Sequence, residues 1–182
     1  MMKSDYREWG YNTSRVICNP VSADDIENIS ALYCSETVMQ MIAPPCEVEN
    51  ARVIAERCVN VTAANTQDCF WSLTLKDDNR WVGVMGLLQQ KTDNTIAEMG
   101  IMLSPDISVK GVATEVISGM LPIAFIKMGY EEIFSEYRND HIAIQTIANK
   151  LGFVVSEPKR EEDRGVKSAC KLEKSAWFLK NS

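Results

Sequence analysis

The segment from Glu98 to Thr114 has the pattern of a strand, a short loop and the first turn of a helix. Its loop holds Pro105 and Gly111, and an apolar helical pattern starts directly after the glycine. Backbone N–H groups in such a loop and first turn have no partner within the helix, and the helix dipole adds partial positive charge. A glycine lets an anion approach the backbone closely, although one glycine in such a turn also occurs for purely steric reasons. The segment therefore indicates an anion cradle that would fit a pyrophosphate.

Hydrophobic periodicity on both sides of this segment predicts the elements that must position it. Helices are predicted over 26–33, 37–42, 47–61, 111–128 and 142–151, and strands over 15–18, 70–75, 81–90, 95–103, 133–137, 153–156 and 168–172. Pro122 is expected to kink the fourth helix. The third helix is expected to bury one face, made of Val48, Ala51, Ile54, Ala55 and Cys58. The alternation of strands and helices predicts an α/β fold with a mixed sheet.

The bulk composition is that of a soluble globular protein, with 46% hydrophobic and 24% charged residues among 182. Because the first ten residues are charged rather than apolar, and no apolar run is long enough to span a bilayer, we expect a cytoplasmic protein with no membrane partner. The net charge of −6 disfavours nucleic acid as a partner. It suits a cationic substrate, or it simply aids solubility.

Cysteine and histidine positions do not form a metal-binding pattern. The cysteines are widely spaced without a CxxC pair, and His141 is the single histidine. We therefore expect no metal site. In a cytosolic setting the cysteines are interpreted as small, buried or half-buried hydrophobic residues rather than as disulfide partners. They are Cys18, Cys34, Cys46, Cys58, Cys69 and Cys170.

Two longer stretches raise the specificity of the cradle motif: "AEMGIMLSPDISVKGVATEV" and "YRNDHIAIQTIANKLGF". Together they resemble the GNAT superfamily of N-acetyltransferases and, within it, the ribosomal-protein-alanine acetyltransferase-like branch, whose consensus reads "aeiGywl.pe..gkGyatEa" and later "N.aS..v.eklGF". The stretches "SRVICNPVSADDIENISALY" and "WVGVMGL" also match that branch, so the resemblance spans nearly the whole chain. It implies one GNAT domain over 1–182, with α+β layers: a central mixed, mostly antiparallel twisted sheet and helices on both faces.

The resemblance also implies acetyl-CoA as co-substrate and assigns its binding site. The family's cradle motif, Q/R-x-x-G-x-G/A, falls on Ser108, Val109, Lys110, Gly111, Val112 and Ala113, with Ser108 where Gln or Arg is usual. By the same resemblance, a splay in the strand that ends in Gly100, Ile101, Met102 and Leu103 would free backbone groups to hold the pantetheine arm and polarise the thioester carbonyl. The remaining residues expected to bind the cofactor are Thr114, Asn139 and His141.

Acyl transfer needs a neutral amine, so the resemblance makes Glu98 the first candidate for a general base. Glu98 would alternatively order the strand edge or bind the substrate ammonium. The family's usual donors to the CoA thiolate are absent, because Ala148 stands where Tyr is common and Ile144 where Ser is common. His141 is a second catalytic candidate, with a capping or surface role as its alternative.

The expected activity is direct transfer of acetyl from acetyl-CoA to a primary amine in a ternary complex. The acceptor is either the N-terminal α-amine of a protein or peptide, or a small molecule such as a polyamine, an aminoglycoside or an aminoacyl-nucleotide antibiotic. Its pocket is expected around 39–46 and 159–167, in a monomer or a homodimer. The alternative from another class is a non-catalytic acyl-CoA-binding sensor or scaffold, which the missing donors favour.

Overall fold

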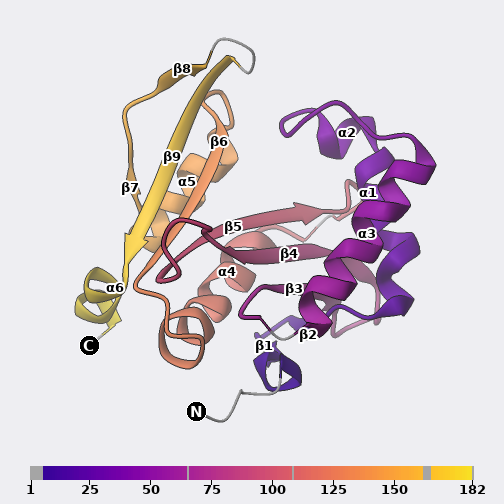
Figure 1. Cartoon of the computed structure of the whole chain (residues 1–182), viewed down its shortest axis with the longest axis horizontal. Helices are drawn as coiled ribbons and strands as arrows, with labels where there is room; N and C mark the ends of the chain where they lie inside the picture. Colours follow the sequence, from indigo (N-terminus) through magenta and orange to yellow (C-terminus); the bar gives the residue numbers. More distant parts are fainter. Residues whose placement is uncertain (1–5, 65, 108, 162–164, 182) are drawn as a thin grey trace.

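The computed structural model describes residues 6–64, 66–107, 109–161 and 165–181 of the chain (Figure 1). The strands are β1 (Tyr11–Asn12), β2 (Val16–Pro20), β3 (Cys69–Leu75), β4 (Trp81–Gln89), β5 (Ile96–Leu103), β6 (Glu132–Arg138), β7 (Val154–Val155), β8 (Lys159–Glu161) and β9 (Gly165–Glu173). The helices are α1 (Ile26–Cys34), α2 (Glu36–Met39), α3 (Val48–Ala63), α4 (Val112–Pro122), α5 (Ile142–Leu151) and α6 (Lys174–Asn181), with short helical turns η1 (Tyr6–Trp9), η2 (Ala23–Asp25) and η3 (Ile123–Lys127).

The strands form one sheet in the order β1-β2-β3-β4-β5-β6-β9-β7, with β8 paired to β9. Each neighbouring pair is antiparallel except β5 and β6, which run parallel. The predicted mixed, mostly antiparallel sheet is therefore confirmed. A parallel pair needs a long crossover, and α4 with η3 supplies it between β5 and β6.

Helices cover both faces of the sheet, as Figure 1 shows. On one face Ile29 of α1 and Ala55 of α3 pack with Val84 of β4. On the other face Val116 of α4 packs in the larger core cluster with Met85, the next residue along β4. Because successive residues of a strand point to opposite faces, these neighbours of β4 face different helical layers.

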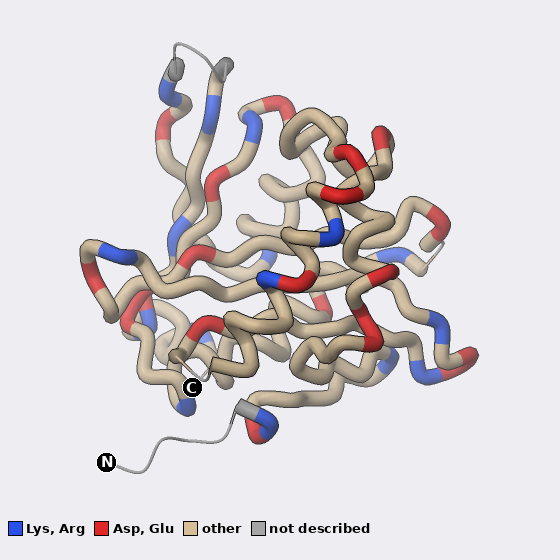
Figure 2. The backbone as a smooth tube through the Cα atoms, turned by 45° about the vertical axis from the view of Figure 1, so that its right-hand side comes forward, with Lys and Arg blue, Asp and Glu red and all other residues tan. Residues whose placement is uncertain are grey.

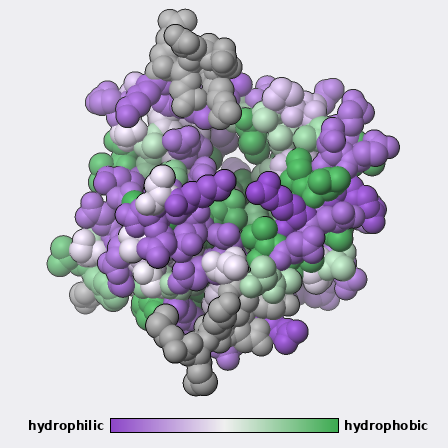
Figure 3. All heavy atoms as spheres, viewed as in Figure 1, coloured by the Kyte–Doolittle hydropathy of each residue, from purple (hydrophilic) through white to green (hydrophobic). Residues whose placement is uncertain are grey.

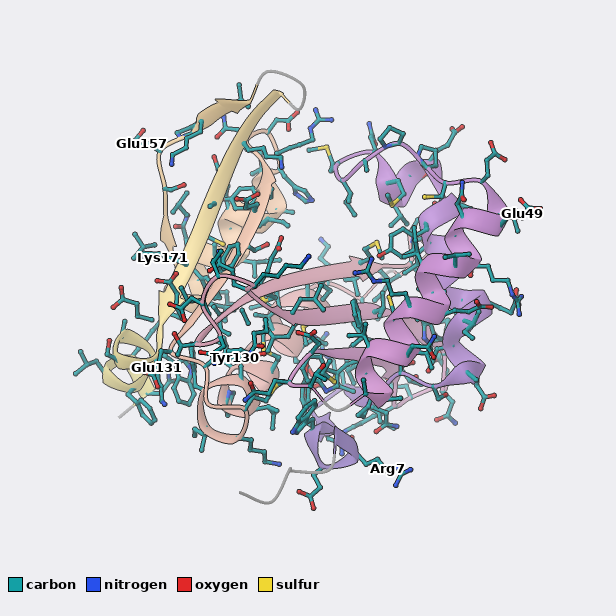
Figure 4. The ribbon with its side chains drawn as sticks, in the orientation of Figure 1. Arg7, Glu49, Tyr130, Glu131, Glu157 and Lys171 are labelled. Atoms are coloured by element: carbon teal, nitrogen blue, oxygen red, sulfur yellow. The ribbon has the colours of Figure 1, made fainter. Side chains whose placement is uncertain are left out.

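Pro122 marks a change in the helix that joins β5 to β6. After this residue the chain forms a π-helix, Ile123–Lys127, in which the Met128 N–H donates to the Ile123 carbonyl at 2.9 Å. Gly129 follows with φ +81°, a left-handed conformation that glycine adopts without strain. Tyr130, labelled in Figure 4, is then fully buried and donates from its hydroxyl to the Gln67 carbonyl at 3.1 Å.

The prediction that Val48 lies on the buried face of α3 was wrong, because its side chain is 68% exposed. Val48 is the first residue of α3, and a helical side chain leans toward the N-terminus, so it projects beyond the part of the helix that packs. Thr62, at the other end, is buried instead, and its hydroxyl oxygen accepts from the Phe70 N–H at 2.9 Å.

Short or polar elements escaped the prediction from periodicity. These are β1, β8 and α6.

Each of the described cysteines is a free thiol, four buried and two half-buried, as expected. Within the described ranges, no helix is long and apolar enough to cross a membrane. Figure 2 shows Lys and Arg interspersed with Asp and Glu along the described chain.

Candidate active site

The sheet opens between β5 and β6. The two strands are paired only where Ile96–Glu98 lie beside Glu132–Phe134, after which β5 continues to Leu103 with β4 as its only strand partner among the described residues. Figure 1 shows the two strands diverging from this point. The backbone of Met99–Leu103 is therefore free of strand pairing on its β6 side among the described residues, which is the splay that the family resemblance led us to expect.

A cavity of about 730 Å³ passes through this opening. One part of the cavity lies on the face of the sheet that carries α1 and α3, next to α2, and we call it the α2 half. Its apolar lining includes Val38, Met41, Ile42, Phe70, Leu88 and Met102. On the opposite face, which we call the α5 half, its lining includes Ala113, Ile117, Ile144, Ile147, Ala148 and Cys170. Figure 3 shows hydrophobic atoms around a hollow between two arms of the molecule. One arm carries α1, α2 and α3, and the other carries β6, β9 and α5 (Figure 1). One continuous space thus reaches both faces of the sheet.

The N-terminus of α4 lies at one end of the α5 half, where Ala113 lines the cavity. Gly111 precedes the helix with φ +81°, a conformation that would strain other residues. The first intrahelical bond runs from the Glu115 N–H to the Gly111 carbonyl at 3.0 Å, so the N–H groups of 112–114 precede it. The Arg15 guanidinium donates to the Lys110 carbonyl at 3.1 Å, so this carbonyl has a partner. The turn therefore combines an occupied carbonyl with N–H groups that have no partner within the helix, as an anion cradle requires.

Glu115 fixes this turn to the start of the sheet. Its carboxylate accepts from the Ser14 hydroxyl at 2.9 Å, from the Arg15 N–H at 2.8 Å and from Arg15 Nε at 2.6 Å. Burial alone would raise the pKa of Glu115, but hydrogen bonds from Thr13, Arg15 and Ser14 outweigh it and lower the pKa to about 2. The carboxylate is therefore ionised throughout the physiological range and serves as a structural anchor.

Glu98 lines the α2 half of the cavity and is paired across the sheet with Leu88. It makes no hydrogen bond or ion pair with any described residue. Burial and then the nearby charge of Glu136 raise the pKa of Glu98, while Lys167 lowers it. Glu136 itself lies 3.7 Å from Lys167 Nζ. The site thus holds one carboxylate that has no cationic partner of its own.

His141 and Asn139 have different surroundings. His141 lines the cavity at the N-cap of α5, and its side chain makes no capping hydrogen bond. Asn139 does not line the cavity, and its Oδ1 accepts from the Ser168 hydroxyl at 2.7 Å. The structure therefore brings His141 to the site and leaves Asn139 bound to β9.

The other predicted residues divide into two places. Glu98, Ile101, Met102, Leu103, Ala113 and His141 line the cavity. Val109, Lys110, Gly111, Val112 and Thr114 lie in or beside the turn at the start of α4, outside the cavity lining. Ser108 lies outside the described residues.

Lys167, the last residue of the stretch 159–167 expected at the acceptor pocket, lines the cavity. The cavity has further polar residues that the sequence reasoning missed, among them Ser135, Glu136, Tyr137 and Arg138. These four belong to β6, where exposed and buried residues alternate. That alternation was the available signal, because it places Glu136 and Arg138 on one face and Ser135 and Tyr137 on the other.

Groups that could exchange protons with a ligand are sparse in the α5 half. Ala148 and Ile144, at the positions of the family's usual donors, line it with apolar atoms. Tyr137 is 5% exposed, and its hydroxyl has no hydrogen-bond partner among the residues that the structure describes. Burial raises the pKa of Cys170 to about 11, and it does the same for Cys58 in the α2 half. Both thiols are therefore protonated near neutral pH.

Arg138 connects the two arms of the molecule across the cavity. Its Nη1 donates to the Gln40 carbonyl, just after α2, at 3.2 Å. The rest of the guanidinium is held by Asp140, at 3.1 Å from Nε and 2.8 Å from Nη2. The positive charge of Arg138 is thus already paired.

Comparison with known proteins agrees with this architecture. A family model described as an acetyltransferase (GNAT) domain matches residues 15–154. A relative, the uncharacterized N-acetyltransferase YoaA of Bacillus subtilis (strain 168), is 25% identical over 146 residues, covering 78% of this chain and 80% of that protein.

Solved structures share the fold at low sequence identity. Spermidine N-acetyltransferase from Vibrio cholerae, in complex with CoA and spermine, has a TM-score of 0.78 and 16% identity, covering 91% of this chain and 99% of that one. The RimL ribosomal L7/L12 alpha-N-protein acetyltransferase, in complex with coenzyme A, has a TM-score of 0.75 and 12% identity, covering 90% of this chain and 97% of that one.

The family model covers most of the chain, and the sheet opening, the turn before α4 and most of the cavity lining lie within the match, while Lys167 and Cys170 of the lining follow it. The protein is therefore an acyltransferase enzyme with N-acetyltransferase activity, and the chain belongs to the acetyltransferase (GNAT) domain family.

Proposed function

We propose that the protein transfers acetyl from acetyl-CoA directly to a primary amine, with both substrates bound at once. The observation that carries this proposal is the cavity that passes through the opening between β5 and β6. One ligand can enter from the α5 half and another from the α2 half, so that their reacting atoms meet at the unpaired edge of β5.

Acetyl-CoA fits the α5 half. The N–H groups at the start of α4 would hold the pyrophosphate, since they have no partner within the helix. The apolar walls from Ile117, Ile144 and Ile147 suit the pantetheine arm, and the free backbone of Met99–Leu103 would pair with its amides. A backbone N–H on this edge is also the donor that would stabilise negative charge on the thioester oxygen.

The chemistry on the amine side is assigned to Glu98. As the amine nitrogen attacks the thioester carbon, a C–N bond forms, the C–S bond breaks with its electron pair on sulfur, and the amine proton passes to the Glu98 carboxylate. A raised pKa and the lack of a cationic partner make this carboxylate a better proton acceptor than an ion-paired one. His141 lines the same cavity and is a second candidate for proton transfer.

Direct transfer is favoured over an acyl-cysteine intermediate. The cavity contains two cysteines, Cys58 and Cys170, and burial raises the pKa of each to about 11. The thiolate is the nucleophilic form, and at neutral pH these residues hold almost none of it. Initial-rate lines are therefore expected to intersect when both substrates are varied, and parallel lines would contradict direct transfer.

The test is turnover with a panel of amines: peptides with free N-termini, polyamines, aminoglycosides and aminoacyl-nucleotides. Product should be followed by mass spectrometry, because the protein's own free cysteines react with thiol reagents. Glu98→Gln is expected to lower kcat about 100-fold or more if the carboxylate is the base. Unchanged kcat in this variant would remove Glu98 from the mechanism.

A second candidate, a sensor that binds acyl-CoA without turnover, is favoured by one observation. Ala148 and Ile144 present no proton donor to a departing thiolate. Positioning alone supplies a large part of an acyl-transfer rate, so the missing donors weigh less than the intact cavity. Calorimetric binding of acetyl-CoA without acetylation of any amine would establish the sensor.

A further inference from the structure

The α2 half of the cavity has a floor built from facing pairs of residues on β4 and β5. Val84 lies opposite Met102, Gly86 opposite Gly100, and Leu88 opposite Glu98. Side chains of facing residues lie on the same side of a sheet, so the two glycines leave a gap in the middle of this floor.

The two glycines differ in what lies above them. A Cβ on Gly86 would come within 2.6 Å of the Phe70 ring, so that ring covers its backbone. A Cβ on Gly100 would meet nothing within 4 Å. The space above Gly100 is therefore empty, with Phe70 beside it and Glu98 two residues away on the same face.

The walls around this space are apolar. Ile42 is 52% exposed and Leu88 is 38% exposed, and both line the cavity. Val38, Met41 and Phe70 complete the same wall. A concave apolar surface with one convergent charged group is the usual form of a small-ligand site.

The charges at the site favour a ligand with a single positive charge. Glu98 has no cationic partner, whereas Glu136 lies 3.7 Å from Lys167 Nζ. Arg138 and Lys167 stand on the same side of the sheet as Glu98, because Glu98 is paired with Phe134 and Arg138 with Lys167. Both cations already have acidic partners, Asp140 and Glu136, so Glu98 is left to pair with one cationic group of a ligand. A second ammonium would lie against the apolar wall, where a charge without a partner is unfavourable.

We infer that the acceptor is a primary amine attached to an apolar body, with the amine nitrogen at Glu98 and the apolar part over Gly100 against Phe70. An acceptor that binds as an ammonium gives one proton to Glu98 to become the nucleophilic amine, and the proton released on attack passes to the departing CoA thiolate. This inference rests on the proposed function, since it names the acceptor class for the same cavity. It disfavours polyamines and aminoglycosides as acceptors. An arylalkylamine and a peptide N-terminus with an apolar first residue share the required chemistry.

The experiment measures both binding and turnover for a matched series: hexylamine, 2-phenylethylamine, ethanolamine, spermidine and kanamycin, together with amidated peptides that begin with Leu or Asp. Binding is measured calorimetrically with CoA present, so it does not depend on catalysis. Burial of each methylene is worth about a fourfold gain in affinity, so hexylamine is expected to bind at least tenfold more tightly than ethanolamine. Comparing the Leu and Asp peptides with the free amines shows whether the acceptor is a small apolar amine or a peptide whose first residue is apolar.

Three variants tie the effect to the site. Gly100→Val should weaken apolar amines at least tenfold, because the added side chain takes up space in which a Cβ meets no atom within 4 Å. Ile42→Ala should weaken hexylamine several-fold but not ethanolamine. Ile126→Ala is the matched control, since Ile126 is 59% exposed and lies outside the cavity lining.

Each outcome decides the inference. Selective binding of apolar amines without acetylation would support it and refute the proposed function. Tighter binding of spermidine or kanamycin than of hexylamine would overturn it and leave the proposed function in place. Equal effects of Ile42→Ala and Ile126→Ala, or no binding by any amine, would also overturn it.

Discussion

Glu115→Gln should destabilise the protein at neutral pH by an amount that the structure sets. The carboxylate accepts hydrogen bonds from Ser14 and Arg15, and its pKa falls from 4.5 to about 2. A fall of that size corresponds to about 3 kcal/mol in favour of the ionised folded state. Because the side chain is 16% exposed and solvent screens part of the interaction, we expect about 2 kcal/mol of lost stability.

The pH dependence of this loss has a definite sign. A folded-state pKa below the unfolded value of 4.5 stabilises the protein fully above that value, and the contribution is lost as the pH falls toward about 2. The stability difference between wild type and Glu115→Gln should thus be constant at neutral pH and shrink below about pH 4.

Urea unfolding of wild type and Glu115→Gln from about pH 3.5 to pH 7 measures this difference. Glu27→Gln is the control, because Glu27 makes the same kind of ion pair, with Arg52, but its side chain is 79% exposed. That control should be close to wild type at every pH. A Glu115→Gln loss no larger than that of Glu27→Gln, or one that grows on acidification, would refute the reasoning.

Three further predictions concern the cavity. Tyr137→Phe should leave stability unchanged or raise it by up to about 1 kcal/mol, because it removes a buried hydroxyl without a partner, whereas Tyr130→Phe should lose about 1 kcal/mol in the same urea assay; equal losses would contradict this. The pKa of Glu98, followed by carboxyl-carbon NMR, should lie above the usual glutamate range and fall in Glu136→Gln, where a repelling charge is removed; a rise would show the wrong sign. Cys170→Ala should retain turnover within about threefold, because its thiol is protonated, and a loss of about 100-fold would indicate an acyl-cysteine.

The sequence was most informative at positions where the residue type alone decides the local property, such as a glycine at a helix end or an apolar residue that cannot donate a proton. Gly111 before an apolar helical pattern predicted the turn at the start of α4, and the structure gives it φ +81°. Gly152 likewise ends α5 with φ +91°. Ala148 and Ile144 were identified as positions without a proton donor, and the cavity is apolar at both.

Backbone register and side-chain partners were beyond the sequence reasoning. The point at which β5 and β6 separate depends on pairing between segments more than thirty residues apart, which no local pattern encodes. Asn139 was expected to bind the cofactor, but its partner Ser168 comes from a strand later in the chain. Lys167 was expected at the acceptor pocket but before the predicted strand 168–172, whereas it lines the cavity as part of β9.

The empty space above Gly100 bears on how the substrate range of this protein can change over evolution. Gly100 lies in regular β5 with no positive φ, and a Cβ added there meets no other atom within 4 Å. Substitutions at this position would therefore change the volume offered to the acceptor while leaving the fold and the α4 turn intact. A single substitution of Gly100 by a larger residue would therefore be enough to favour smaller acceptors. The glycine facing it, Gly86, offers no such route, because the Phe70 ring already occupies the space above it.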